Sequence, residues 1–323
     1  MSAESASQPE VLAVSKLSPL LMPQLTAAFK LHDRLHELDP AALAHIAPQL
    51  RGIAASGESK VSAALIAQLP ALEIISVMGV GYDGVDVVAA KAQGVMVTHT
   101  PDVLNDDVAD LAIGLMLCAA RQLPAADRFV RAGQWPQGAM PLASKMSGGR
   151  LGLVGMGRIG QAIAHRALAF GMSVAYTARS AKPELAHRFV PNVVALAAEV
   201  DFLVIITPGG AGTRKLVNAE VLQALGQGAG KGIVVNVARG SVVDEAALID
   251  ALERGVIAGA GLDVFEAEPQ VPERLRALPH VVFTPHVGSA TQATRQAMAD
   301  LAFNNLAAHF AGQPVLTPVP ECR

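Results

Sequence analysis

Several residue types that mark particular classes of protein are scarce in this chain. Its 323 residues include two cysteines, Cys118 and Cys322, which we interpret as inert thiols in a reducing, cytoplasmic compartment rather than as a disulfide framework. The formal net charge is -3 and the basic residues are scattered, so we expect neither nucleic acid nor a membrane surface as a partner. The longest apolar run, residues 111–120, is far shorter than the roughly 20 residues that span a bilayer, so we expect a buried helix there.

The N-terminal residues lack the basic start and apolar core of a secretory signal. Residues 1–10 contain acid and no Lys or Arg, so we expect a frayed tail. The remaining composition, with 51% apolar and 16% charged residues, is that of a compact protein long enough for two domains of ordinary size.

Short β-rich runs alternate with Ala- and Leu-rich helical patterns in two series. The predicted strands are residues 11–15, 52–56, 74–79 and 95–100, then 151–154, 173–177, 202–207, 232–238, 258–264 and 281–284. This alternation predicts an α/β fold of two Rossmann-like, doubly wound parallel-sheet domains with a cleft between them. We predict two domains. Residues 1–99 and 287–323 form a substrate-binding domain, and residues 100–286 form a nucleotide-binding domain.

Residues 106–140 lie between the two series and do not continue the alternation of strands and helices in either of them. They predict a long helix through Gln122 and then Arg131-Ala-Gly-Gln-Trp-Pro136, which has no strand to pair with, so we interpret the segment as an interdomain arm. The helical pattern at residues 291–310 follows the last strand of the second series and is expected to pack on the first domain.

The pattern G-x-G-x-x-G, which can hold a pyrophosphate at the start of a helix, occurs twice. The copies are Gly79-Val-Gly-Tyr-Asp-Gly84 and Gly155-Met-Gly-Arg-Ile-Gly160. Asp83 would repel phosphates in the first copy, whereas the second carries an arginine, follows a clean strand and opens a helix. We therefore predict a dinucleotide site formed by Gly155, Gly157, Arg158, Ile159 and Gly160.

The first glycine copy has two explanations. It is either a plain tight turn or a backbone nest in which the N–H groups of Val80 and Gly81 hold a substrate carboxylate.

The segment after the next predicted strand indicates which dinucleotide binds. NAD enzymes usually carry Asp or Glu about 20 residues beyond the glycines, where it accepts the ribose 2′-hydroxyl. Residues 174–182 contain no acid and offer Arg179, Ser180 and Lys182 to a 2′-phosphate instead. We therefore predict NADPH (NADP) as the preferred cofactor, with NADH possible if the segment is a solvated basic turn that tolerates either.

Arg239, Glu268 and His286 each stand at or just beyond the end of a strand-like run. Active sites in parallel α/β sheets lie outside the carboxyl ends of the strands, so we expect the three to converge. His286 can donate a proton, Glu268 can orient the ring and favour its charged form, and Arg239 can grip a carboxylate. Each alone has an ordinary structural explanation, but together with a dinucleotide loop they indicate reduction of a 2-keto acid.

From about residue 74 to residue 310 the chain resembles the D-isomer-specific 2-hydroxyacid dehydrogenase family. The resemblance rests on Gly79-Val-Gly-Tyr-Asp-Gly-Val-Asp86, Leu151-Gly-Leu-Val-Gly-Met-Gly-Arg-Ile-Gly160, Val235-Asn-Val-Ala-Arg-Gly-Ser-Val-Val-Asp-Glu245, and Gly261-Leu-Asp-Val-Phe-Glu-Ala-Glu-Pro269 with Thr284-Pro-His-Val-Gly-Ser289.

The resemblance implies a role for each candidate residue. Arg239 would bind substrate, Glu268 and His286 would form the acid–base pair, and the nest would contact the carboxylate. No metal is expected. The implied cofactor-binding residues beyond the glycine loop are Val108, Arg179, Ser180, Lys182, Thr207, Pro208, Thr213, Val237, Ala238, Asp263, His286 and Gly288. The family is usually homodimeric through the arm, from which Trp135 would reach the partner's substrate.

Within that family, the Arg179-Ser180 pair is similar to the NADP-linked glyoxylate and hydroxypyruvate reductases and to plant hydroxyphenylpyruvate reductases. We therefore expect an NADPH-dependent reductase of small 2-keto acids, glyoxylate or hydroxypyruvate. A reductase of aromatic keto acids would differ in pocket volume. A nucleotide-sensing scaffold, like the family-related corepressors, would need an exposed peptide groove or basic tail, and the sequence shows neither.

Overall fold

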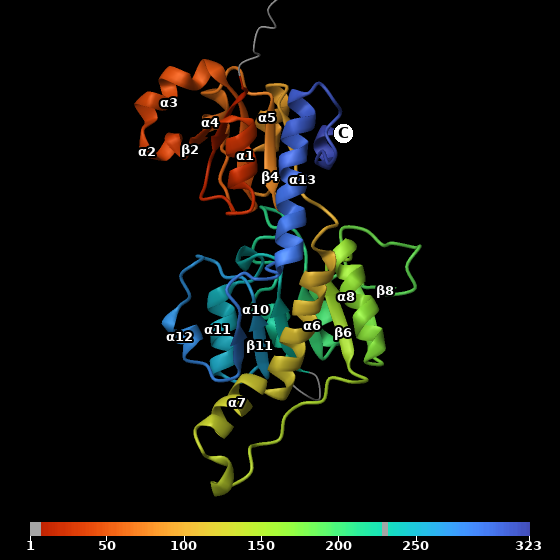
Figure 1. Cartoon of the computed structure of the whole chain (residues 1–323). Helices are drawn as coiled ribbons and strands as arrows, with labels where there is room; N and C mark the ends of the chain where they lie inside the picture. Colours follow the sequence, from red (N-terminus) through yellow and green to blue (C-terminus); the bar gives the residue numbers. More distant parts are fainter. Residues whose placement is uncertain (1–7, 228–231) are drawn as a thin grey trace, which may run out of the picture. The chain divides into compact units, whose positions relative to one another are not determined.

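The computed structural model describes residues 8–227 and 232–323, so most of the expected N-terminal tail lies outside the described residues. The chain divides into two compact units (Figure 1). The first unit comprises Met1–Leu104 and Ala290–Arg323, and the second comprises Asn105–Ser289. The sequence predicted boundaries after residues 99 and 286. The structure divides the chain a few residues later, after Leu104 and after Ser289.

The first unit contains a five-stranded parallel sheet in the order β2-β1-β3-β4-β5. The central strands read as nearly continuous apolar runs because helices cover both faces of such a sheet. The strands are β1 (Glu10–Ala13), β2 (Lys30–Asp33), β3 (Leu50–Ser56), β4 (Ile74–Met78) and β5 (Met96–Thr98).

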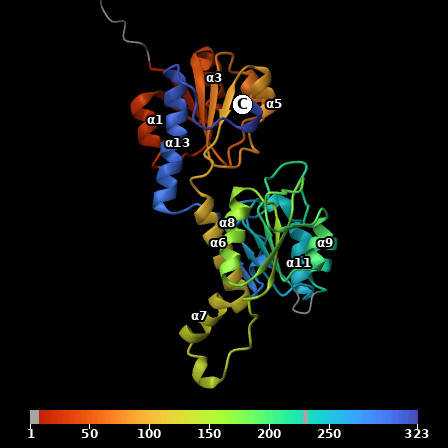
Figure 2. The same cartoon turned by 90° about the vertical axis from the view of Figure 1, so that its right-hand side faces the viewer.

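Helices cover both faces of this sheet (Figure 2). On one face lie α1 and α13, and α13 contacts β4 and is tied to it where Ser76 Oγ donates to the Ala302 carbonyl at 2.8 Å. The other face is covered by helices whose apolar residues form one cluster with the strands. The helices are α1 (Met22–Ala28), α2 (Leu35–Leu38), α3 (Pro40–Ile46), α4 (Ala63–Ala67), α5 (Val87–Ala92) and α13 (Gln292–Phe310), with 3-10 turns η1 (Ala47–Gln49) and η4 (Pro320–Cys322).

The second unit contains a seven-stranded parallel sheet in the order β12-β11-β10-β9-β6-β7-β8. The chain moves outward from β6 through β7 to β8 and then returns to β9 on the other side of β6, so the strand order reverses between β6 and β9. The strands are β6 (Arg150–Val154), β7 (Ser173–Thr177), β8 (Arg188–Phe189), β9 (Phe202–Ile205), β10 (Ile233–Asn236), β11 (Gly259–Leu262) and β12 (Val281–Phe283).

Two helical layers enclose this second sheet, with α6 and α8 on one side and α9 and α11 on the other (Figure 2). The helices are α6 (Asn105–Arg121), α7 (Leu123–Arg131), α8 (Arg158–Ala169), α9 (Val193–Ala198), α10 (Ala219–Leu225), α11 (Glu245–Glu253) and α12 (Glu273–Arg276), with 3-10 turns η2 (Trp135–Gln137) and η3 (Gly240–Val242). Both sheets are parallel and covered by helices, which confirms the expected α/β fold of doubly wound parallel sheets.

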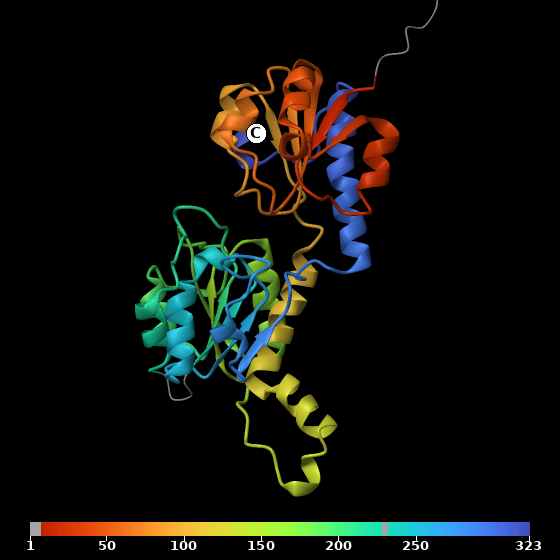
Figure 3. The same cartoon turned by 90° about the vertical axis from the view of Figure 1, so that its left-hand side faces the viewer.

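The segment expected to be an arm projects from the second unit as α7, η2 and an irregular return (Figure 3). No single helix in the described residues is long and apolar enough to cross a membrane. Helices α6 and α7 reach the required length and apolar composition only when they are counted together, and the two helices are bent by 58° relative to each other.

The sequence prediction missed the edge strands β2 and β8 and the helix α7. Strand β2 is an edge strand with partly exposed residues, so it carries no apolar run, and β8 has only two residues. Helix α7 follows Gln122, which is left-handed at φ 52°, and starts anew with a proline in its first turn.

Candidate active site

The second glycine loop connects β6 to α8 at the point where the strand order of the second sheet reverses, which is where open α/β sheets bind ligands. Gly155 has φ +112°, and a Cβ there would lie 2.6 Å from the Ile206 carbonyl oxygen. A Cβ on Gly160 would lie 2.5 Å from the Gly155 oxygen, so both glycines allow close packing. Gly157 is exposed and nothing approaches its Cβ position within 4 Å, which leaves the backbone open to a pyrophosphate at the start of α8.

The basic segment after β7 is open to a ligand. Arg179 and Ser180 are exposed, and neither makes a hydrogen bond or ion pair to another described residue. The backbone N–H of Lys182 donates to the hydroxyl of the buried Tyr176 at 2.7 Å, so the sheet holds this turn in place. An exposed arginine with no partner in residues 8–227 and 232–323 fits a 2′-phosphate.

The other residues assigned to the cofactor have varied surroundings. Thr207 is half-buried just beyond β9, and Thr213 closes the following loop because its hydroxyl donates to the Pro208 carbonyl at 2.7 Å. Val237 and Ala238 follow β10 and are buried, and their N–H groups donate to Ile205 and Asn236. Because both N–H groups donate within the protein, a cofactor would contact Val237 or Ala238 through other backbone atoms.

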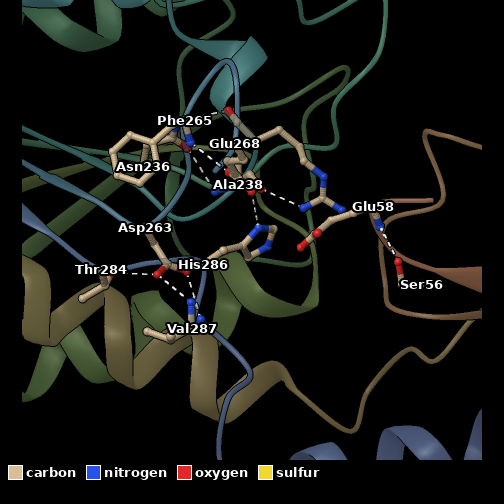
Figure 4. Close-up of polar contacts among 12 residues, drawn as sticks. Ser56, Glu58, Asn236, Ala238, Asp263, Phe265, Glu268, Thr284, His286 and Val287 are labelled. Atoms are coloured by element: carbon tan, nitrogen blue, oxygen red, sulfur yellow. Dashed lines mark hydrogen bonds and ion pairs between the residues drawn. The ribbon is translucent and has the colours of Figure 1, made fainter. Parts of the chain in front are cut away.

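Glu268 and His286 are brought together from the loops after β11 and β12 (Figure 4). Nδ1 of His286 lies 2.7 Å from Oε2 of Glu268, and Oε1 of Glu268 accepts the backbone N–H of Phe265 at 2.8 Å. The side chains are 28% and 26% exposed, so both remain accessible to a substrate.

The pKa of Glu268 lies below its ordinary value of 4.5 as the outcome of opposing effects. Burial raises this pKa, but the hydrogen bonds from His286 and from the Phe265 N–H lower it, and the charges of His286 and Arg239 lower it further. The carboxyl is therefore ionised at neutral pH, beside an imidazole whose protonated form it stabilises.

Arg239 is held near this pair by the loop after β10. Asn236 brackets the loop: its Nδ2 donates to the Arg239 carbonyl at 3.0 Å and its Oδ1 accepts the Ala238 N–H at 3.0 Å. Nη1 of Arg239 donates to the Ala238 carbonyl at 2.8 Å, which orients the guanidinium. A Cβ on Gly240 would lie only 1.9 Å from the Phe265 carbonyl carbon, so this loop packs directly against the one that carries Glu268.

Asp263 has a bracing role that sequence reasoning missed. It is 2% exposed; its Oδ1 accepts the Thr284 hydroxyl at 2.6 Å and the Val287 N–H at 2.8 Å, and its Oδ2 accepts the Gly288 N–H at 2.9 Å (Figure 4). Its carbonyl also accepts the N–H of His286 at 2.8 Å. These bonds surround a histidine with φ 53°, a left-handed conformation that costs a non-glycine residue free energy and occurs often at functional sites.

The remaining candidates lie in three places. Val108 of α6 is buried beside Gly288, whose Cβ position is 3.4 Å from a Val108 methyl group. Trp135 is 68% exposed on the arm. In the first unit, neither Val80 nor Gly81 donates its backbone N–H to another described residue, so both amides are available to an anion.

The chain matches one family model, described as the D-isomer specific 2-hydroxyacid dehydrogenase, NAD binding domain, over residues 113–288. It is 46% identical over 312 residues to hydroxyphenylpyruvate reductase of Plectranthus scutellarioides, covering 96% of this chain and 98% of the relative. It is 49% identical over 270 residues to glyoxylate/hydroxypyruvate reductase A of Arabidopsis thaliana, covering 84% and 85%.

A solved structure is similar over nearly the whole chain. It is the NADPH-dependent glyoxylate/hydroxypyruvate reductase of Sinorhizobium meliloti in complex with NADP and malonate. The two share 48% identity with a TM-score of 0.91, and 98% of each chain is covered.

Proposed function

Since the chain belongs to the D-isomer-specific 2-hydroxyacid dehydrogenase family, we propose that it is an NADPH-dependent reductase that converts glyoxylate and hydroxypyruvate to 2-hydroxy acids. The proposal rests mainly on one observation, the hydrogen-bonded Glu268–His286 pair with the Arg239 charge beside it, in the same unit as the glycine loop.

The acid–base pair supplies the proton of the proposed reaction. Nδ1 of His286 is engaged with Glu268 at 2.7 Å, so the proton for the carbonyl oxygen comes from Nε2. The ionised Glu268 stabilises the charged ring before the transfer and orients it throughout. When bound, the nicotinamide supplies the hydride for the carbonyl carbon.

Arg239 binds the substrate carboxylate and polarises the carbonyl in this proposal. A guanidinium is planar and can donate two parallel hydrogen bonds to a carboxylate, which a lysine cannot. In the first unit, the nest of Val80 and Gly81 is proposed to offer its backbone N–H groups to a substrate carboxylate.

Arg179 is the proposed basis of NADPH preference. It is exposed, lacks a protein partner among the described residues and follows β7, where an NAD enzyme usually has an acid. The Sinorhizobium meliloti relative, which is NADPH-dependent and was solved with NADP, supports this choice.

The arm supports a proposed homodimer. It exposes the large apolar side chains of Leu123, Val130 and Trp135, which are 47%, 55% and 68% exposed, and Leu142 just beyond it is 99% exposed. A run of such residues on a projecting segment is typical of an interface.

A reductase of hydroxyphenylpyruvate is the second candidate, because the relative from Plectranthus scutellarioides carries that name at 46% identity over 96% of this chain. An oxidation assay of NADPH and NADH with glyoxylate, hydroxypyruvate and hydroxyphenylpyruvate tests both candidates. Preferred turnover of the small acids with NADPH supports the proposal, and preference for the aromatic acid supports the second. Nucleotide binding without turnover of any acid would indicate a scaffold instead.

A further inference from the structure

We propose that His99, a buried histidine of the first unit, is a positioning residue that orients the Gly81 N–H toward the substrate carboxylate. The proposal rests on the proposed function, because it concerns the carboxylate that Val80 and Gly81 are proposed to hold. His99 is 6% exposed and follows β5, and its Nδ1 lies 3.0 Å from the carbonyl oxygen of Val80.

The direction of this hydrogen bond follows from chemistry. A carbonyl oxygen only accepts, so Nδ1 of His99 must carry the hydrogen. The Val80 carbonyl and the Gly81 N–H belong to one planar trans peptide and point in opposite directions. Fixing the carbonyl toward His99 therefore fixes the direction of the Gly81 N–H, and polarisation of the peptide makes that N–H a better donor.

Within the described residues, few hydrogen bonds hold the peptide between Val80 and Gly81. Neighbouring hydrogen bonds fix the loop on either side, where the Gly79 carbonyl accepts the Thr100 N–H at 2.9 Å and the Tyr82 carbonyl accepts the Val85 N–H at 2.9 Å. Within the described residues, the bond from His99 is the one that reaches the peptide between Val80 and Gly81. Because a glycine follows that peptide, its plane can rotate easily when the bond is absent.

His99 is itself firmly anchored. Its backbone N–H donates to the Thr317 carbonyl at 3.1 Å, and its carbonyl accepts the Thr317 hydroxyl at 2.6 Å. Asn305 of α13, fully buried, donates in turn to the Thr317 hydroxyl at 2.8 Å. The ring also packs edge-on against Tyr82, with centroids 5.2 Å apart. A ring anchored in this way can define the orientation of a loop peptide.

The test compares two variants and two substrates. In His99→Asn the side-chain amide nitrogen lies about where Nδ1 lies, whereas His99→Leu has no donor. Glyoxylate carries the carboxylate, and its neutral ester methyl glyoxylate does not. Loss of one hydrogen bond to a charged group should lower kcat/KM for glyoxylate about tenfold in the leucine variant, mainly through KM. The loss for methyl glyoxylate should stay within about threefold, the KM for NADPH should not change, and the asparagine variant should recover most of the glyoxylate activity.

His309→Leu is the matched control. This residue is another hydrogen-bonded histidine of the first unit, whose Nε2 lies 3.0 Å from Glu73, and its side chain is 24% exposed. It should leave the ratio of the two substrates unchanged. If the leucine variant of His99 does not fold, His99→Gln takes its place, because glutamine reaches the Nε2 position and again lacks the donor at Nδ1.

Three outcomes overturn the proposal. Equal losses for the two substrates would mean that His99 only stabilises the fold, and an unchanged leucine variant would mean that the bond has no role. Failure of the parent enzyme to reduce any keto acid would remove the proposed function and this inference with it. An active parent with unselective variants would refute the inference alone.

Discussion

Replacement of Glu268 by glutamine tests the acid–base pair most informatively. Glutamine keeps the size of the side chain and can still accept the Phe265 N–H, which lies 2.8 Å from Oε1 in the parent. It removes the negative charge 2.7 Å from Nδ1 of His286. The variant therefore changes the electrostatics of the histidine with little change in packing.

The expected loss follows from the strength of the lost contact. A hydrogen bond to a charged group contributes about 1.5–3 kcal/mol, and the two side chains are 28% and 26% exposed, which favours the lower end of the range. Reductive kcat/KM at neutral pH should therefore fall about tenfold to thirtyfold.

The pH profile should also change, with a definite sign. The pKa of Glu268 lies below its ordinary 4.5, so in the parent the carboxylate stays charged above that value and keeps the ring protonated to higher pH. Without that charge the ring loses its proton at lower pH. The pH above which reduction declines should therefore move down in the variant.

The assay is the initial rate of NADPH oxidation with glyoxylate across pH 5 to about 9, where His-dependent steps titrate. Circular dichroism and the melting temperature show whether the variant is folded. An unchanged profile with unchanged kcat/KM would refute the role of Glu268, and a shift to higher pH would contradict the sign of the electrostatic argument.

Two further substitutions, the second with a matched control, test the cofactor contact and the loop packing. Arg179→Ala should raise the KM for NADPH about tenfold and leave the KM for NADH nearly unchanged, because it removes a charged donor to the 2′-phosphate; equal losses would argue against that contact. Gly240→Ala should lower stability by about 3 kcal/mol or more in thermal unfolding, because its Cβ would overlap Phe265, whereas Gly114→Ala, with nothing within 4 Å inside α6, should be neutral or stabilising. Equal melting temperatures for the two glycine variants would show that the loops do not pack as described.

The sequence predicted the fold well where strands are buried and apolar. Strand β7 begins and ends at the expected residues, Ser173–Thr177, because apolar residues are flanked by a glycine turn and a basic segment. Edge strand β2 could not be found, since its half-exposed residues give no period of two. The end of the long helix was expected at Gln122, and α6 ends at Arg121, but the new helix α7 after the left-handed Gln122 was not expected, because no residue there demands that conformation.

For the site, the sequence predicted which residues converge but not what holds them. Arg239, Glu268 and His286 could be grouped because carboxyl ends of parallel strands share one edge. The positive φ of His286 and the four hydrogen bonds that Asp263 accepts depend on contacts over more than twenty residues of chain or on backbone geometry, which hydrophobic periodicity does not encode. The same is true of His99, whose partner Val80 lies on another loop.

The measurement that tests the central claim most directly is kcat/KM for NADPH oxidation by hydroxypyruvate in the parent and in Arg239→Ala and His286→Ala. We predict sustained turnover by the parent and a decrease of about 100-fold or more in each variant, with folding retained. Turnover by either folded variant within a few-fold of the parent would contradict the assignment of the guanidinium and the imidazole to the chemistry.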